Sequence, residues 1–294
     1  DIERNFDDPW SDEQKDSLLA MKPDGAVVAL GWVYMNPDPE DVNKAYLWLE
    51  VHPDVRGQGL GAAMLSWLEE RGKQRLLEKP ESRQCELRIG CPELLQERVA
   101  LFERFGFQPI RYFFRMRRDL VQPIPDKSLP EGLSLRTYHP DLDQSLMKAF
   151  NDSFQDHWNF TPVTEVDWGL FFTGRSVFRP DISYLAMVSN PESGGEQVAG
   201  FCLNSVSPEE NERQGIREGW INQLGVRRPW RKRGVATALL CLSMAAFKSD
   251  GLDFATLGVD AENLTGALQL YERLGFKPVK RYISFAKAVC TPGD

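Results

Sequence analysis

A basic turn followed by small residues contains the side chains of this chain that are best suited to chemistry. Residues 227–233 hold four arginines and one lysine. A strand-like apolar run ends at Val226, and from Gly234 onward apolar residues recur with helical spacing. A helix N-terminus carries unpaired N–H groups and the positive end of the helix dipole, and both favour a bound anion. The stretch therefore predicts a phosphate-binding turn.

Residue types within the turn support this interpretation. Gly234 and Ala236 are small enough for a pyrophosphate to approach the backbone, and Arg231 and Arg233 add charged donors. A strand–helix turn with merely exposed arginines is the simpler alternative. The residues expected to bind phosphate here are Arg231, Lys232, Arg233, Gly234, Val235, Ala236 and Thr237.

The same arrangement occurs earlier in the chain. An Arg-x-x-Gly-x-Gly turn begins at Arg56, 175 residues before the equivalent Arg231. The stretch LFERFGFQP at 101–109 matches LYERLGFKP at 270–278, at an offset of 169 residues. Two motifs that recur in the same order indicate a duplicated domain.

Two other phosphate-binding motifs fit less well. Residues 57–62 satisfy the loose Gly-x-Gly-x-x-Ala dinucleotide pattern. However, the second copy of the turn has no Gly-x-Gly, and five residues separate the first strand from its first glycine. No Gly-Lys-Ser/Thr follows, which disfavours a P-loop.

The turn, together with Asn263-(x)7-Tyr271-x-x-x-Gly-Phe further on, resembles the motifs of the GCN5-related N-acetyltransferases. The resemblance covers most of residues 20–120 and 131–289, and two copies in one chain resemble the tandem members of the mycothiol synthase type. It implies an α/β fold of two tandem domains, each with a mixed, mostly antiparallel sheet flanked by helices. It also implies transfer of an acetyl group from acetyl-CoA (acetyl-coenzyme A) to a primary amine.

The resemblance also implies which further positions contact the coenzyme. In the second half, the thioester carbonyl is expected to be polarised by a backbone N–H near Gly225 and Val226. The remaining expected coenzyme-binding residues are Leu224 and Asn263 in the second half, and Val51, Arg56, Gly57, Gln58, Gly59, Leu60 and Gly61 in the first.

Tyr271 is the expected catalytic acid. Attack of an amine on a thioester expels a thiolate, which a nearby phenol can protonate. The resemblance assigns this role to Tyr271, eight residues after Asn263 on a helix expected over 263–274; a core aromatic is the alternative. Phe102 and Leu94 stand at the matching positions of the first half. Chemistry is therefore expected in the second half alone, with the first half structural or coenzyme-holding.

A base and an acceptor site are also expected in the second half. Glu218 is the one carboxylate on the alternating face of residues 218–224, so it is proposed as the base, against the alternative of a solvated strand-end glutamate. An aromatic loop at 156–162 is expected to hold the amine by cation–π contacts and hydrogen bonds, against the alternative of a packed surface loop. The expected acceptor-binding residues are His157, Trp158, Phe160 and Asn222. Trp168, Phe171 and Phe172 are interpreted as core residues.

Composition limits the partners. The net charge of −8 argues against nucleic acid or an anionic membrane as partner. Five scattered cysteines and three histidines leave few ligands for a metal site, and the thiols are expected to be reduced, as in a cytoplasmic protein. No signal-peptide or membrane-spanning pattern is found. Acetyl-CoA and a small-molecule amine are the expected ligands. A non-catalytic acyl-CoA sensor and a protein-modifying acetyltransferase are the alternatives.

The elements that position these residues form two predicted domains. The first spans 1–120, a Pro-rich linker spans 121–132, and the second spans 133–294. The first half lacks the opening strand and helix of the second, so it is either a trimmed domain or incomplete at its start. Expected strands in the second half are 133–137, 183–189, 197–206, 219–226, 254–259 and 281–289; expected helices are 142–154, 165–172, 234–248 and 263–274.

Overall fold

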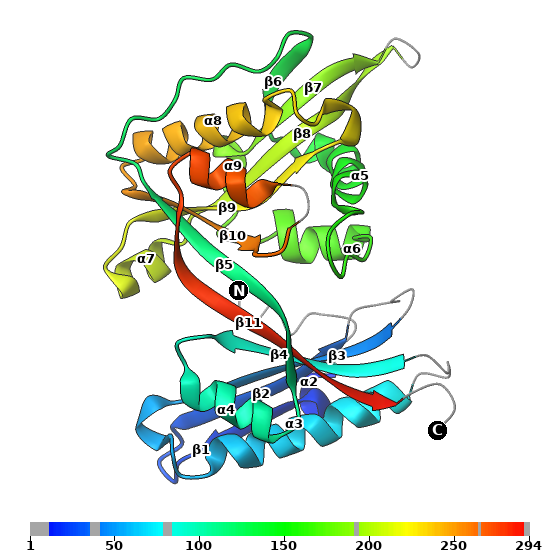
Figure 1. Cartoon of the computed structure of the whole chain (residues 1–294), viewed down its shortest axis with the longest axis vertical. Helices are drawn as coiled ribbons and strands as arrows, with labels where there is room; N and C mark the ends of the chain where they lie inside the picture. Colours follow the sequence, from blue (N-terminus) through cyan, green and yellow to red (C-terminus); the bar gives the residue numbers. More distant parts are fainter. Residues whose placement is uncertain (1–11, 36–41, 79–83, 191–193, 264–265, 291–294) are drawn as a thin grey trace. The chain divides into compact units, whose positions relative to one another are not determined.

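The computed structural model describes residues 12–35, 42–78, 84–190, 194–263 and 266–290. The chain forms two compact units. One comprises Asp1–Phe113 with Arg281–Asp294, and the other comprises Phe114–Lys280. Each unit is a mixed sheet flanked by helices, as the duplicated motifs predicted (Figure 1).

The first unit is built around strands in the order β1-β2-β3-β4-β11. The β3–β4 pair is parallel, and the other described pairs are antiparallel. Its elements are α2 (Glu13–Asp16), β1 (Ser17–Met21), β2 (Val27–Met35), β3 (Val42–Val51), η1 (Pro53–Val55), α3 (Leu60–Leu77), β4 (Gln84–Pro92), α4 (Gln96–Arg104) and the second part of β11 (Lys277–Cys290). Buried apolar residues of α3, among them Leu65 and Leu68, pack against the sheet.

The second unit has the strand order β5-β10-β9-β8-β7-β6. The β9–β10 pair is parallel, whereas β6–β7, β7–β8 and β8–β9 are antiparallel. Its strands are the second part of β5 (Gln108–Asp119), β6 (Leu133–Thr137), β7 (Tyr184–Asn190), β8 (Gly195–Ser205), β9 (Glu218–Val226) and β10 (Phe254–Asp260). Its helices are η2 (Pro140–Leu142), α5 (Asp143–Phe154), α6 (Glu165–Trp168), the π-helical turn η3 (Gly169–Thr173), η4 (Pro180–Ile182), α7 (Pro208–Gln214), η5 (Arg228–Trp230), α8 (Val235–Ser249) and α9 (Ala267–Arg273).

Each face of this second sheet is covered by its own helices and has its own cluster of core residues (Figure 1). On one face, α8 and α9 pack through residues such as Leu239, Phe247 and Tyr271. On the other face, α5 and α6 pack through Phe150 and Trp168. A ligand that reached through the sheet would therefore meet different helices on its two sides.

The units differ from the predicted boundaries at their closing strands. In sequence, each repeat ends in a strand of its own, over 111–118 and 281–289. In the structure, residues 114–119 of β5 complete the second unit and residues 281–290 of β11 complete the first. Local patterns cannot predict this exchange, because both closing strands carry similar apolar alternation and pairing is decided by distant partners.

Other differences have local causes. The helix expected over 263–274 begins only at Ala267, because Gly266 adopts a left-handed φ of +79°. The helix α7 was not expected between β8 and β9. Cys85 is disulfide-bonded, so the expectation of reduced thiols is wrong for this residue, although Cys91, Cys202 and Cys241 are free and buried. No helix of the described ranges is long and apolar enough to cross a membrane.

Candidate functional site

The turn between β9 and α8 forms an open cradle of backbone donors. Lys232 and Gly234 adopt left-handed φ values of +61° and +88°, and Gly234 is an N-cap that supplies no side-chain hydrogen bond. The first helical hydrogen bond runs from Ala238 N to Gly234 O at 3.0 Å. The preceding N–H groups, at 235–237, therefore have no acceptor inside the helix. No neighbouring heavy atom lies within 4 Å of a Cβ placed on Gly234, so an anion has room to approach.

The first unit repeats this loop conformation. Gly57 and Gly59 carry φ values of +74° and +85°, at positions equivalent to Lys232 and Gly234. Gly59 likewise caps α3 without a side-chain bond. Arg56 Nε donates to Val51 O at 3.1 Å, matching the 3.1 Å bond from Arg231 Nε to Val226 O. Each arginine therefore ties its turn to the end of the preceding strand.

The guanidinium of Arg231 is occupied by protein acceptors. Its Nη1 lies 2.9 Å from Asp156 Oδ2, and its Nη2 donates to Ser153 O at 2.9 Å. Arg228 also pairs with Asp156, at 2.6 Å. Hydrogen bonds from Arg228 and then Arg231 lower the pKa of Asp156 to about 2. Arg231 thus holds the end of α5 against the cradle. The sequence had instead predicted that the Arg231 guanidinium binds the phosphate.

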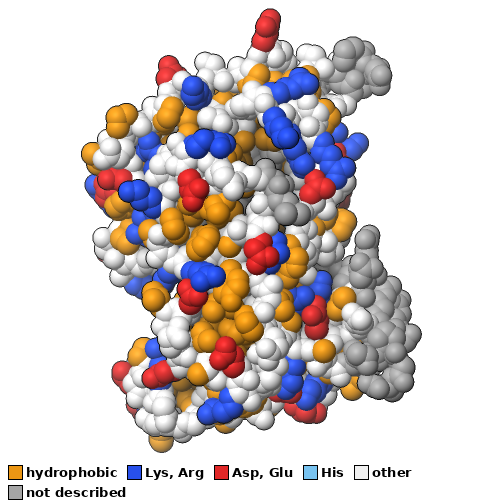
Figure 2. Space-filling view, viewed as in Figure 1, with side chains coloured by type: hydrophobic (Ala, Val, Ile, Leu, Met, Phe, Trp, Pro, Cys, Tyr) orange, Lys and Arg blue, Asp and Glu red, His pale blue; other side chains and the backbone are white. Residues whose placement is uncertain are grey.

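Lys232 and Arg233 are the cations of the turn that remain available. Within the described parts of the chain, neither has an acidic partner, and the Arg233 guanidinium lies over the ring of Trp230 at 5.0 Å. Figure 2 shows basic side chains gathered over η5 and the start of α8. Backbone N–H groups with these two cations fit a diphosphate.

Beyond the cradle, β9 and β10 separate and leave a fork. Their parallel pairing ends at Ile221 and Leu257, although β9 continues to Val226 and β10 to Asp260. At the same level Asn222 forms a bulge, because Ile221 and Gln223 pair with consecutive residues of β8. In the first unit β3 and β4 also part, after Tyr46 and Arg88, but β2 and β3 pair there without a bulge.

Backbone donors of β9 point into this fork. Arg227 N donates to Ala199 O at 3.0 Å, and hydrogen-bonding direction alternates along an antiparallel pair. The N–H of Gly225 therefore points toward β8, whereas the N–H groups of Leu224 and Val226 point toward the side that β10 has left. Of the two residues expected to polarise a thioester, this geometry favours Val226 and adds Leu224.

Tyr271 lies on α9 with 8% of its surface exposed. Burial raises the pKa of its phenol, and the nearby Cys202 thiol adds to the effect, so the hydroxyl is held protonated. In the first unit the equivalent Phe102 is fully buried and packs edge-on against Phe285 at 5.6 Å. Asn263 precedes α9 and donates its backbone N–H to Asp260 O, so it lies outside the helix that was expected to contain both it and Tyr271.

Glu218 is an ion-pair partner at the start of β9. It is 3% exposed, and its carboxylate pairs with Arg115 and with Arg117, the latter at 2.7 Å. It also accepts hydrogen bonds from Trp220 Nε1 at 3.0 Å and Thr256 Oγ1 at 2.8 Å. Both carboxylate oxygens are therefore engaged, which leaves neither of them free to take a proton from an amine. The predicted role as base does not fit these contacts.

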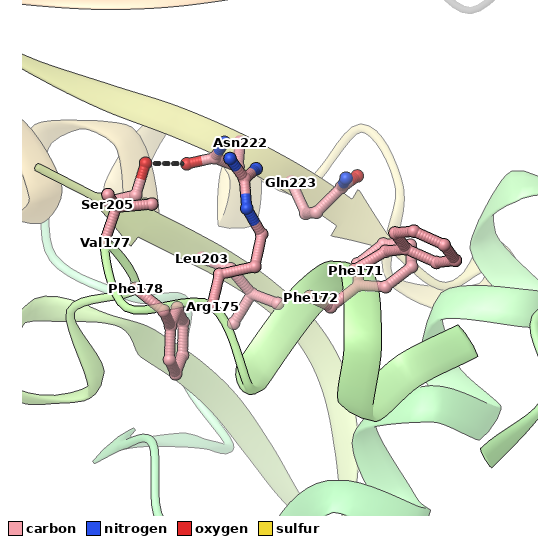
Figure 3. A pocket seen from close by; sticks show the side chains of 9 residues that line it. All are labelled: Phe171, Phe172, Arg175, Val177, Phe178, Leu203, Ser205, Asn222 and Gln223. Atoms are coloured by element: carbon pink, nitrogen blue, oxygen red, sulfur yellow. Dashed lines mark hydrogen bonds between the residues drawn. The ribbon is translucent and has the colours of Figure 1, made fainter. Parts of the chain in front are cut away.

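A pocket lies on the α5–α6 face of the sheet, at the bulge (Figure 3). Ser205 Oγ donates to Asn222 Oδ1 at 2.5 Å, which fixes the amide at the pocket wall. The space amounts to about 360 Å³ and is open to solvent. The lining residues are Phe171, Phe172, Arg175, Val177, Phe178, Leu203, Ser205, Asn222 and Gln223.

Of the expected acceptor residues, Asn222 alone lines this pocket. The centroid of the His157 ring lies 4.3 Å from that of Phe154, with the two rings tilted, and the pKa of His157 is lowered, first by burial and then by the charge of Arg231. Phe160 packs toward Phe150 at 6.5 Å, and Trp158 is 37% exposed. The loop that carries them borders the cradle.

Sequence reasoning missed Arg175, Ser205 and Gln223 as pocket residues. It also assigned Phe171 to the core, whereas Phe171 is 41% exposed. Phe172 packs against the core cluster as expected, and both rings also line the pocket. The bulge that brings Asn222 and Gln223 to one wall leaves no mark in the sequence. Arg175 lies in an irregular segment, where no periodicity assigns a face.

Comparison with known proteins gives consistent matches. The acetyltransferase (GNAT) family model matches residues 1–107 and 143–276. Mycothiol acetyltransferase of Thermobispora bispora is 30% identical over 273 residues, covering 88% of this chain and 84% of that protein. The same enzyme of Acidothermus cellulolyticus is 30% identical over 280 residues, covering 90% and 78%.

Solved structures match over almost the whole chain. A GCN5-related N-acetyltransferase from Sphaerobacter thermophilus has a TM-score of 0.71 at 29% identity, covering 98% of this chain and 84% of that one. A tandem GNAT protein from the clavulanic acid biosynthesis pathway has a TM-score of 0.66 at 18% identity, covering 95% and 84%. The second match supports the duplicated fold alone.

Proposed function

Since the chain belongs to the acetyltransferase (GNAT) family and is an N-acetyltransferase, we propose that its second unit transfers an acetyl group directly from acetyl-CoA to a primary amine of a small molecule. The observation that carries the proposal is the fork between β9 and β10. It lies between a cradle of free helix N–H groups, a buried phenol and a pocket on the opposite face of the sheet.

In this mechanism each residue has a simple task. The N–H groups at 235–237, with Lys232 and Arg233, hold the diphosphate of the coenzyme. Arg231 keeps the turn and the end of α5 in place. The N–H groups of Leu224 and Val226 donate to the thioester oxygen as negative charge develops on it.

Proton transfer follows from the two faces of the sheet. An amine in the pocket attacks the thioester carbon from the α5–α6 side. Tyr271, on the α8–α9 side, gives its phenolic proton to the departing sulfur. Because the Glu218 carboxylate is paired with arginines, we assign it no part in removing the proton of the amine, which leaves through the open pocket to solvent.

The first unit has a coenzyme-type cradle but no acid. Its turn copies the left-handed positions of the second, yet Phe102 cannot donate a proton and the β2–β3 pair lacks the bulge. We propose that this unit is structural or holds coenzyme without turning it over.

The test is Tyr271→Phe. We expect kcat to fall by about 10²–10⁴-fold while the affinity for coenzyme A, measured by calorimetry, changes little. An acid must be protonated to act, so activity is lost as pH rises through its pKa. Because burial raises that pKa, the wild-type enzyme should keep its activity to pH values above about 10. A variant with normal kcat would remove the acid role.

Thiol release with a panel of small amines separates this function from two alternatives. An acyl-CoA sensor would bind coenzyme without releasing thiol. A protein-modifying enzyme would release thiol only with protein acceptors, detected by mass spectrometry; the small pocket at Asn222 favours small molecules.

A further inference from the structure

The acceptor pocket has a polar wall and aromatic walls. Ser205 and Asn222 form the polar wall at the bulge of β9, whereas the rings of Phe172 and Phe178 come from η3 and the segment that follows it (Figure 3). Arg175 also lines the pocket, but it already has an interaction partner within the protein. A ligand that extends from the fork into the pocket therefore meets two phenylalanine rings.

Each of these two rings is held by a larger aromatic side chain outside the pocket. The Trp168 ring stacks on Phe172, with the ring centroids 4.8 Å apart and the ring planes 11° apart. The Tyr138 ring meets Phe178 edge-on, with the centroids 5.0 Å apart. Trp168 and Tyr138 are 3% and 8% exposed, and neither is among the described residues that line the pocket. They therefore support the two phenylalanine rings from the protein interior.

A single carboxylate oxygen joins the two supporting side chains. Asp143 Oδ1, at the start of α5, accepts the Nε1–H of Trp168 at 2.9 Å and the hydroxyl of Tyr138 at 2.8 Å. Burial, and then this hydrogen bond, raise the pKa of the Tyr138 phenol, so the hydroxyl remains a donor. Hydrogen bonds to an ionised acceptor are stronger than neutral ones. The orientation of both pocket rings is therefore tied to one acidic side chain.

The backbone that carries Phe178 is fixed as well. Phe178 forms an isolated β-bridge with Ser205. On either side of it, Val206 N donates to Val177 O and Arg179 N donates to Asn204 O, each at 2.9 Å. Walls that are already ordered lose little conformational entropy when a ligand binds, and an apolar group that packs on them leaves water. The pocket therefore favours a ligand with an apolar group.

We propose that the acceptor amine carries an apolar group of about the size of a phenyl ring, which packs against Phe172 and Phe178, and that Asp143 is the positioning residue for these two rings. This proposal rests on the proposed function and specifies its substrate class. The amine lies toward the Asn222 side, at the fork, and the apolar group lies toward the rings. A strongly hydrated acceptor such as a sugar would place hydroxyl groups against the rings, where they lose hydrogen bonds to water.

Three small amines test the substrate class. Thiol release is measured with acetyl-CoA and 2-phenylethylamine, ethanolamine or glucosamine, and each rate is normalised to the measured fraction of neutral amine. Wild-type kcat/KM should be about 10–100-fold higher for 2-phenylethylamine than for either polar amine, chiefly through KM, as expected when several apolar carbons are buried. Phe178→Ala removes one wall and should lower this ratio to below about threefold.

Further variants test the role of Asp143. Asp143→Leu removes the acceptor of both hydrogen bonds and should lower the ratio of 2-phenylethylamine to ethanolamine at least about threefold, because the rings are no longer preorganised. Asp143→Asn keeps an acceptor oxygen and should retain most of the ratio. Asp141→Ala removes an exposed carboxylate from the adjacent turn η2 and should keep the wild-type ratio. If Asp143→Leu does not fold, Tyr138→Phe and Trp168→Phe each remove one hydrogen bond, keep an aromatic ring and should lower the ratio by a smaller factor.

The possible failures are distinct. Equal rates for the three acceptors, a preference for either polar amine, or an unchanged ratio in Phe178→Ala would each overturn the proposed substrate class while leaving acetyl transfer intact. An unchanged ratio in Asp143→Leu, or in both Tyr138→Phe and Trp168→Phe, would overturn the role of Asp143. No thiol release with any amine would overturn the proposed function itself.

Discussion

The inferred role of the Glu218 side chain changes once its interaction partners are known. From the sequence it is a carboxylate at the start of the central strand, and a base is a reasonable role. In the structure Arg115 and Arg117 come from β5, about 100 residues away in the chain, and their guanidinium groups lie over the rings of Trp220 and Phe254. The carboxylate therefore neutralises two partly buried cations.

Glu218→Gln tests this role. The substitution keeps the shape but leaves both arginines without a counter-charge, so the free energy of unfolding should fall by about 2–4 kcal/mol, somewhat less than for a fully buried pair because the arginines are partly exposed. Chemical denaturation measures it. Asp253→Asn, which breaks the exposed pair with Arg217, should have a smaller effect. If the Glu218→Gln protein instead kept the wild-type stability and had a much lower kcat, the result would support Glu218 as the catalytic base.

Tyr271 differs from Glu218, because its surroundings in the structure are compatible with the role predicted for it. The sequence predicted that it lies on a helix, as it does on α9, and the contrast with Phe102 is visible without a structure, while its role as the acid stays a prediction. The sequence could not show that Tyr271 is buried beside Cys202, and therefore could not show that the pKa of its phenol is raised. The place of Arg175 in the pocket wall was not predictable, because it depends on which loop faces the bulge at Asn222.

The turn and helix α8 are the elements in which local sequence determined local structure. Glycine at 234 permits the left-handed residue that starts the helix, and two copies of the motif give the same backbone. The start of α9 was predicted less well, since Gly266 interrupts the helical pattern. The side-chain roles within the turn also differ from expectation, because Asp156, which follows α5, pairs with Arg228 and Arg231.

Arg231→Glu should weaken coenzyme A binding at least tenfold in calorimetry. The new carboxylate opposes the diphosphate at a helix N-terminus, and it also repels Asp156 and releases the end of α5. Arg217→Glu makes the same change of charge beside Asp253, away from the cradle, and serves as the control. Equal affinity in wild-type and Arg231→Glu protein would show that the coenzyme binds elsewhere.

The whole molecule is organised by the exchange of closing strands. Residues 114–119 belong to the second unit although they precede the linker, and they include Arg115 and Arg117 as well as Arg118. Arg118 is 4% exposed and donates to the carbonyls of Leu274 and Pro123 at 2.6 Å each. It thereby supports the C-terminal end of α9, the helix that carries Tyr271.

Two fragments distinguish this arrangement from the boundaries expected from sequence. A fragment of residues 114–280 should unfold cooperatively on heating, because it contains the complete second sheet. A fragment of 131–294 lacks β5, so Glu218 loses both arginines and β10 is left as an edge strand; it should aggregate or melt at a much lower temperature. Circular dichroism and size-exclusion chromatography measure both. The reverse order of stability would mean that the closing strands are not exchanged.

The placement of residues 281–290 beside β4 has a consequence for synthesis on the ribosome. The sheet that contains β1 to β4 is closed by a strand that is translated only after the whole second unit, so β4 remains an open edge until residues 281–290 have left the ribosome. The nascent first unit must therefore wait, with an unpaired β-edge that chaperones can bind, through the translation of the second unit.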